Sequence, residues 1–144
     1  NGIWPWIRPG ERILNHNDPG GVTGWRKSIE FPGSIQMGYL AEFVQQFEWW
    51  NLYPANEMLV HQPGEEIFNH WISVVKSADN ATILVYIPEK TDVELYNSQG
   101  YEYSAQWFNP VTNEYFDAEI LLANHSIKFT HSFENDMLII LKKK

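Results

Sequence analysis

The sequence has no cysteine. This absence excludes a disulfide framework, a thiolate zinc site and a thiol nucleophile. It does not fix the cellular compartment, because many exported bacterial proteins also lack cysteine. Long apolar runs are absent too. The longest, Ile83 to Ile87, has the length of a strand, whereas a membrane helix needs about 20 apolar residues, so no membrane span is expected.

Basic residues are few: 10 Lys and Arg stand against 18 Asp and Glu, which gives a net charge of −8. A protein that binds duplex nucleic acid needs a basic surface, so no nucleic-acid partner is expected. Anionic membrane surfaces are disfavoured for the same reason. The basic run Lys142–Lys144 is too short to reverse this conclusion.

What the sequence does have is apolar and aromatic material, with 44% hydrophobic and 15% aromatic residues. That composition excludes a disordered chain and is sufficient for a core. The 144 residues correspond to one domain or to two small pieces. The chain opens at Asn1 without an initiator Met or a signal peptide, so we expect a mature product or a piece of a longer protein.

The first part of the chain, residues 1–62, is rich in turn signals and contains one predicted helix over residues 33–48. Pro32 suits a first helical position, and apolar residues follow at the spacing of a buried stripe. The stripe consists of Ile35, Tyr39, Leu40, Phe43, Val44 and Phe47. We expect the helix to end at Trp49 and Trp50, which are followed by Leu52–Pro54. We also expect both Trp side chains to pack against the protein.

The second part, residues 63–144, is typical of β structure throughout, with the boundary near His61–Gly64. Short strands separated by regular turn signals predict an antiparallel β-sandwich of about seven strands, so the fold class is mainly β. The strands are expected near residues 70–77, 81–87, 91–96, 101–108, 114–121, 126–133 and 137–142. Met137–Leu141 is continuously apolar, as a central strand would be.

Carboxylate pairs are the first candidates for chemistry, because glycoside hydrolysis needs two carboxyl groups that flank one bond. Asp117 and Glu119 lie two apart on a predicted strand and would share a face. The alternative, a solvated outer strand face, is favoured because nothing aromatic forms a cleft with them. Glu65–Glu66 follows a Pro-Gly turn and is expected to be exposed. No catalytic residue is therefore assigned.

Histidines and short motifs give no cofactor or metal. The five histidines never approach a metal-ligand spacing, and no phosphate-binding loop or nucleophile elbow is present. No cofactor is expected. His131 lies on the apolar side of its predicted strand and is interpreted as a hydrogen-bonded core histidine.

Tryptophans are the most informative residues, because sugar rings stack on exposed aromatic faces. Trp4 and Trp6 flank Pro5 in a turn-rich segment, and Trp25 lies beside Arg26. These three are the predicted substrate-binding residues. The alternative is that they pack in a core or an interface. Trp107 precedes an Asn-Pro turn, and its side chain is expected to fill the core between the two sheets of the sandwich.

Several stretches together carry a resemblance to a known family. The stretches Asn1–Trp4, Trp25–Leu40 and Trp49–Pro54 resemble the end of the catalytic barrel of apiosidase-like glycoside hydrolases. The stretches Val85–Pro88 and Trp107–Asn113 resemble the β-sandwich that follows that barrel, a family named as the collagen-binding domain of a collagenase.

The resemblance implies that residues 1–62 are a remnant of the barrel C-terminus and that residues 63–144 are an ancillary sandwich. A complete (β/α)₈ barrel takes about 250 residues, so the catalytic carboxylates of the family would lie upstream. Only Trp4 would correspond to a family position, beside the sugar site. The parent would be a secreted or periplasmic bacterial glycoside hydrolase, and this chain alone is not expected to be active.

Two alternatives stay open. The chain could be a non-catalytic carbohydrate- or collagen-binding module, or the sandwich could be purely structural. The expected partner is a polysaccharide or oligosaccharide. The apolar stripe of the predicted helix also needs cover, so we expect the sandwich, an upstream barrel segment or a second copy of the chain to pack on it.

Overall fold

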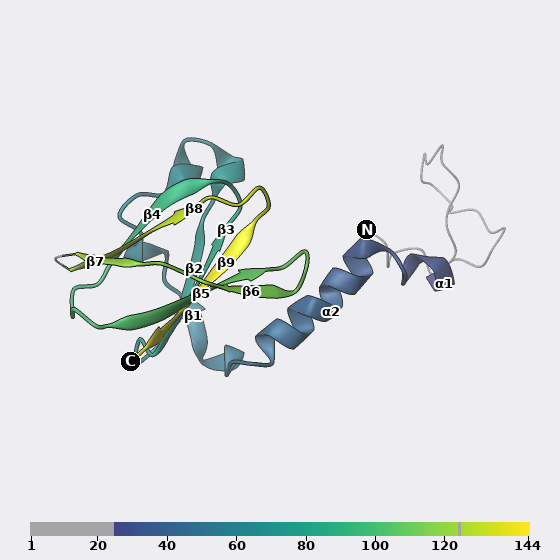
Figure 1. The fold of residues 1–144 in the computed structure, drawn as a ribbon, viewed down its shortest axis with the longest axis horizontal. Coiled ribbons are helices and arrows are strands. Elements are labelled where there is room, and N and C mark those ends of the chain that lie inside the picture. Colours follow the sequence, from purple (N-terminus) through teal and green to yellow (C-terminus); the bar gives the residue numbers. More distant parts are fainter. Residues whose placement is uncertain (1–24, 124) are drawn as a thin grey trace. The chain divides into compact units, whose positions relative to one another are not determined.

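The computed structural model describes residues 25–123 and 125–144. The chain divides into two compact units, residues 1–46 and residues 47–144. In the first unit, α1 (Trp25–Ser28) is one turn long and is followed by α2 (Pro32–Val44). The nine strands of the described residues all lie in the second unit (Figure 1).

Helix α2 begins at Pro32, as predicted, but ends at Val44, and the chain continues in turns to residue 48. Phe43 is its buried residue, at 2% exposure. Ile35 and Leu40 are each 48% exposed. The predicted stripe is therefore apolar but not buried as a whole among the described residues.

The strands form two antiparallel sheets, which confirms the predicted mainly-β sandwich. The larger sheet has six strands in the order β1 (Leu52–Pro54), β2 (Ser73–Ser77), β3 (Thr82–Ile87), β9 (Met137–Lys143), β5 (Tyr103–Asn109) and β6 (Glu114–Asp117). The smaller sheet has three, in the order β4 (Thr91–Tyr96), β8 (Ser126–His131) and β7 (Leu121–Ala123).

The alternation of side chains explains how the sheets enclose a core. In β8, Ile127 and Phe129 are buried while Lys128 and Thr130 are exposed, as expected for a strand with one wet face. β9 lies between β3 and β5 and is the predicted central strand. The core cluster draws on both sheets and on the segment before β2: Ala55, Leu59, Ile72, Val74, Ile83, Val85, Ile87, Val93, Leu95, Tyr103, Trp107, Ile127, Phe129, Met137, Ile139 and Leu141.

One predicted strand is in fact two. Residues 114–121 were expected to form a single strand, but β6 pairs with β5 in the larger sheet and β7 pairs with β8 in the smaller one. The chain crosses between the sheets at residues 118–120. Ala118 and Ile120 pack against the core there, and the Ala118 amide donates to the Ala105 carbonyl over 3.2 Å. The strand in the larger sheet ends at Asp117, and Ala118 and Ile120 are partly buried in the crossing.

A second difference lies before the predicted boundary. Leu52–Pro54, expected only to end the helix, forms β1 and pairs with β2, with Tyr53 opposite Lys76. The turns agree better with the sequence. Asn80 and Asn113 adopt left-handed backbone angles, with φ of 55° and 61°, at two of the predicted turns. Asn tolerates this conformation better than most residues.

The helices of the described residues are too short or too polar for any of them to cross a membrane.

Candidate functional site

The outer face of the smaller sheet carries a row of paired polar side chains. Asp92 in β4 lies opposite Thr130 in β8, and the Thr130 hydroxyl donates to the Asp92 carboxylate over 2.6 Å. Glu94 lies opposite Lys128, with 3.2 Å between its carboxylate and the ammonium. These side chains point away from the core because Val93, between Asp92 and Glu94, is buried.

Two segments raise walls on either side of this row. On the β4 side, Leu59 bridges to Leu95, and the Val60 amide donates to the Glu94 carbonyl over 3.0 Å. This pairing places Val60 and His61 along the edge of the sheet. On the β8 side, the crossing segment brings Glu119 and β7 brings Leu121, which lies opposite Lys128.

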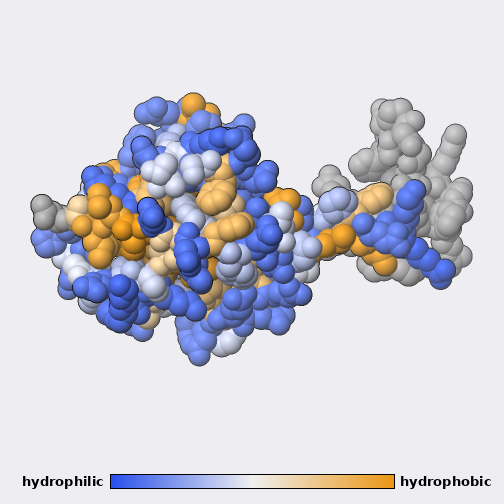
Figure 2. Space-filling view, in the orientation of Figure 1, coloured by the Kyte–Doolittle hydropathy of each residue, from blue (hydrophilic) through white to orange (hydrophobic). Residues whose placement is uncertain are grey.

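Together the row and its walls form a groove of about 770 Å³, which we call the sheet groove. That volume lies within the usual range for small-molecule sites. Hydrophobic surface is visible near the end of β7 (Figure 2), and Leu121 is 64% exposed there. Trp107 and Phe129 reach the groove from the core side.

Trp107 fills the sandwich beneath the sheet groove, as predicted. It is 5% exposed, and its ring contacts Phe129 and Phe133 edge-on at centroid distances of 5.9 and 5.7 Å. Such T-shaped contacts are a preferred geometry of aromatic pairs. Trp107 therefore supports the floor of the groove and offers little free ring for stacking.

The electrostatics of the sheet groove keep one carboxyl group ionised. The neighbouring Ser126 hydroxyl and the Lys128 ammonium, which lies 3.2 Å from the carboxylate, hold the pKa of the Glu94 carboxyl below its usual value. Hydrogen bonds to the charged form have this effect generally. Glu94 is therefore poorly suited to donate a proton near neutral pH, because a general acid needs a raised pKa.

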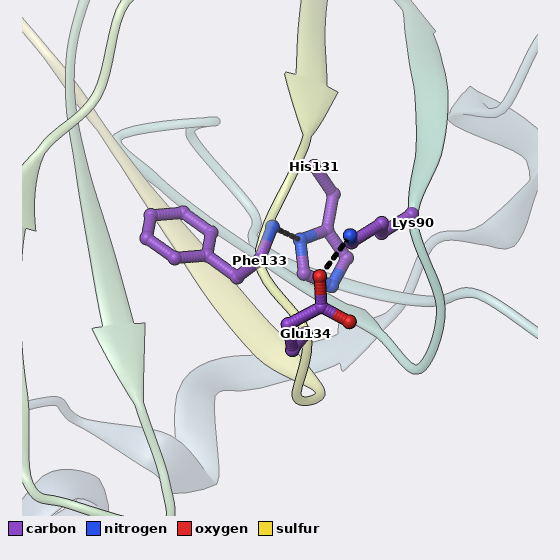
Figure 3. Close-up of polar contacts among 4 residues, drawn as sticks. All are labelled: Lys90, His131, Phe133 and Glu134. Atoms are coloured by element: carbon purple, nitrogen blue, oxygen red, sulfur yellow. Dashed lines mark hydrogen bonds and ion pairs between the residues drawn. The ribbon is translucent and has the colours of Figure 1, made fainter.

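His131 is a core residue, as predicted. It is 1% exposed, and its Nδ1 accepts a hydrogen bond from the Phe133 amide over 3.3 Å (Figure 3). Burial lowers the pKa of its imidazole, against smaller opposing effects from the Asn135 backbone and nearby carboxylates. The ion pair of Lys90 and Glu134 lies beside it in Figure 3. The buried, neutral ring fits a packing role.

A second surface is aromatic. Phe68, Trp71 and Tyr86 are 83%, 40% and 37% exposed and line a shallow depression with Asn69 and Pro88. We call it the aromatic surface.

The loop of residues 62–72, which carries Phe68 and Trp71, is held by hydrogen bonds and close packing. Gln62 accepts a hydrogen bond from the Ile72 amide over 2.9 Å and donates to the Ile72 carbonyl over 2.8 Å. At Gly64, a Cβ atom would lie 2.5 Å from the Cα of Trp71. The backbone at residues 62–72 is therefore held in place, and with it the position of Trp71.

Three Trp residues were predicted to bind substrate. Trp4 and Trp6 lie outside the described residues, and Trp25 is the first residue of α1. Their contact with sugar stays a prediction. Trp49 and Trp50, expected to pack, are instead 57% and 65% exposed and meet edge-on at 5.8 Å. The described residues do not cover these two side chains, and their packing against upstream barrel or a second copy stays a prediction.

Asp117 and Glu119, which the sequence analysis considered as a pair, lie in different elements. Asp117 ends β6 in the larger sheet, whereas Glu119 lies in the crossing segment at the wall of the sheet groove. The prediction that they share one strand is wrong, but both are exposed, as the favoured interpretation of a solvated face expected. Among residues 25–123 and 125–144, no group of three or more acidic or histidine side chains could hold a metal ion.

Sequence reasoning missed the sheet groove because its residues are scattered from Val60 to Thr130. The sequence does show that charged and apolar residues alternate in β4 and β8. This alternation predicts a solvent-facing side of the sheet, but it does not predict that a groove lies there. The aromatic surface was missed because Trp71 and Phe68 stand in no recognisable pattern.

Comparison with known proteins links the start of the chain to a hydrolase family. The family model "Apiosidase-like, catalytic domain" matches residues 1–51. No curated protein matches the chain.

Two solved structures share the fold. One, named "Glycoside hydrolase", is 23% identical with a TM-score of 0.75, over 99% of this chain and 31% of its own. The other is a glycoside hydrolase family 5 structure from Bacteroides vulgatus, 22% identical with a TM-score of 0.71, over 95% and 30%. The chain thus spans about a third of the length of the solved structures it matches. Residues 1–51 are similar in sequence to the apiosidase-like catalytic domain, and the chain shares its fold with the two solved structures.

Proposed function

We propose that this chain is part of a glycoside hydrolase that acts on polysaccharide, with the sandwich as an ancillary domain that supplies no catalytic residue. The observation that carries the proposal is the match of residues 1–51 to the catalytic domain of apiosidase-like proteins. The fold shared with two structures described as glycoside hydrolases supports it.

The chemistry of the sandwich supports a non-catalytic role. Glycosidases need an acid and a base or nucleophile across one bond, about 5–10 Å apart, with one carboxyl tuned upward in pKa. In the sheet groove, the pKa of the Glu94 carboxyl is lowered instead of raised. Asp117 and Glu119 are both exposed and belong to different elements.

The division of labour follows from this assignment. Residues 1–62 would close a catalytic barrel, and residues 63–144 would form the ancillary sandwich. The exposed side chains of α2, such as Ile35, Met37 and Leu40 at 48%, 54% and 48%, would be covered by further barrel or by a second copy of the chain. Sedimentation of the 144-residue chain tests the second of these, since self-association would disappear in a variant with Ile35 and Leu40 replaced by Gln.

A second candidate function is non-catalytic carbohydrate binding, and the sheet groove is the observation that favours it. The collagen-binding alternative stays a prediction. Retention on immobilised collagen, compared with retention of the same chain on insoluble polysaccharide, distinguishes the two.

The deciding experiment for hydrolysis measures released reducing sugar. The 144-residue chain is incubated with plant and bacterial polysaccharides beside a protein extended upstream in the same gene. We expect release by the extended protein and none by the chain. Release by the chain that is lost on Asp117→Asn or Glu119→Gln would contradict the ancillary role, and an inactive extended protein would contradict the hydrolase assignment.

A further inference from the structure

We infer that the sheet groove is a binding site for a saccharide without acidic groups. The choice of a saccharide rests on the proposed function, whereas the location and the charge preference rest on the groove itself. Its floor and walls come from five segments: residues 60–61, β4, β5 through Trp107, β8 and the stretch 119–121.

The polar side chains in the groove match the chemistry of sugar hydroxyls, which donate and accept hydrogen bonds at once. Asp92 and Glu119 offer carboxylate acceptors, and Lys128 offers an ammonium donor. Side chains two apart on a strand are separated by about 6.6 Å, and those on neighbouring strands by about 4.8 Å. The groove therefore presents a lattice of donors and acceptors rather than a single contact.

These polar side chains are already held in position. The Thr130–Asp92 hydrogen bond and the Lys128–Glu94 ion pair fix one partner against the other across the two strands. Side chains that are ordered before binding lose less conformational entropy when a ligand arrives. Each pair also keeps unused acceptor or donor positions, because a carboxylate has about four lone-pair sites and an ammonium has three protons.

Exposed aliphatic groups line the two walls and suit the C–H faces of sugar rings. Val60 is 41% exposed on one wall and Leu121 is 64% exposed on the other. A ring lying across β4 and β8 would place its hydroxyl edge on the polar row and its apolar edge against a wall. This combination of apolar contact with a few placed polar groups is typical of small-molecule sites.

The charge of the groove selects among saccharides. Three carboxylates, those of Asp92, Glu94 and Glu119, face one ammonium, that of Lys128. The excess of negative charge, within a chain of net charge −8, repels uronic-acid and sulfated sugars. A neutral saccharide meets no such repulsion.

The experiment is a two-dimensional NMR titration of the ¹⁵N-labelled chain with three neutral probes, xylohexaose, cellohexaose and mannohexaose, and one acidic probe, hexagalacturonate. We expect at least one neutral probe to shift the amides of β4, β8 and β7 in a saturable way. Hexagalacturonate is expected to bind at least about tenfold more weakly.

Variants locate the site. Thr130→Val and Lys128→Met each remove a hydrogen-bonding group from the groove at nearly constant size, and each should weaken binding several-fold. Glu114→Gln, on exposed β6 outside the groove, and Phe68→Ser, on the aromatic surface, should leave binding unchanged. The amide spectrum of each free variant verifies that it is folded.

Three results would overturn the inference: no saturable shift with any neutral probe at millimolar concentration, tighter binding of hexagalacturonate, or binding lost in Phe68→Ser but retained in both groove variants. The titration involves no bond cleavage, so these failures are separate from a failure of the hydrolase proposal, which is read as absent sugar release by the extended protein.

Discussion

Helix α2 and the sandwich both contain many apolar residues, but α2 leaves more of them exposed. The sandwich buries most of its large apolar residues in one cluster, in which Ile83, Ile139 and Leu141 have no exposed surface. In α2, Phe43 is buried while Ile35, Met37 and Leu40 remain about half exposed. An isolated helix of 13 residues is marginal in water, so α2 depends on apolar cover for its stability.

This contrast supports the proposal that the sandwich is a domain of its own and that α2 is part of another one. A sandwich that encloses its own core can serve as an independent ancillary unit. A helix with an open apolar face is what remains when the elements it packs on belong to another body. This interpretation agrees with the match of residues 1–51 to a catalytic domain.

Truncation of one leucine in each region should give the largest contrast. Leu141→Ala removes a fully buried side chain of the central strand and should lower the free energy of unfolding by about 2–5 kcal/mol. Leu40→Ala, in α2, should change it by less than about 0.5 kcal/mol. Urea denaturation followed by the circular dichroism of the strands measures both, and equal losses would remove the distinction between the regions.

Alanine in place of glycine should act in opposite directions in the two regions. Gly64→Ala places a Cβ 2.5 Å from the Trp71 backbone, which cannot give way cheaply, so we expect a loss of about 1–3 kcal/mol. Gly38→Ala in α2 meets open space and should raise helix stability by about 0.5–1 kcal/mol. Thermal unfolding measures the first and helical circular dichroism the second. A neutral Gly64→Ala would show that the 62–72 loop is not tightly built.

The smallest effect is a pH dependence confined to the sandwich. Burial lowers the pKa of His131 below its ordinary value of 6.5, so the unfolded chain takes up a proton before the folded one does. Stability contributed by the neutral ring is complete above pH 6.5 and is lost as the pH falls below it.

The variant His131→Gln should flatten the stability profile between pH 6.5 and the range where carboxylates titrate. Glu94 and Glu134, whose pKa values are lowered, add a further loss only at more acidic pH. Unfolding free energies measured at a series of pH values verify this. An unchanged slope in the variant would assign the pH dependence to other groups.

Most strands of the sandwich were predictable because they obey local rules. Alternation in β8 and the continuous apolar run of β9 reveal a half-wet strand and a central strand without any tertiary information. The split of residues 114–121 was not predictable, since the burial of Ala118 and Ile120 against the core depends on which sheet each half joins.

The sheet groove was beyond sequence reasoning for a related reason. Glu119 was considered as half of a carboxylate pair with Asp117, but the crossing separates them and brings Glu119 to the wall opposite Val60. Pairing of Asp92 with Thr130 depends on the β4–β8 register, which no local pattern reveals. Distant segments meet there through topology alone.

We propose that the sandwich is a self-contained domain, whereas α2 belongs to a surface that the rest of a catalytic domain would cover. Amide hydrogen exchange on the whole 144-residue chain distinguishes the two regions. We expect protection close to the global unfolding free energy in β3, β5 and β9, and exchange within about tenfold of an unstructured peptide in α2. Protection of α2 equal to that of β9 would contradict it, because the helix would then be part of the same cooperative unit as the sandwich.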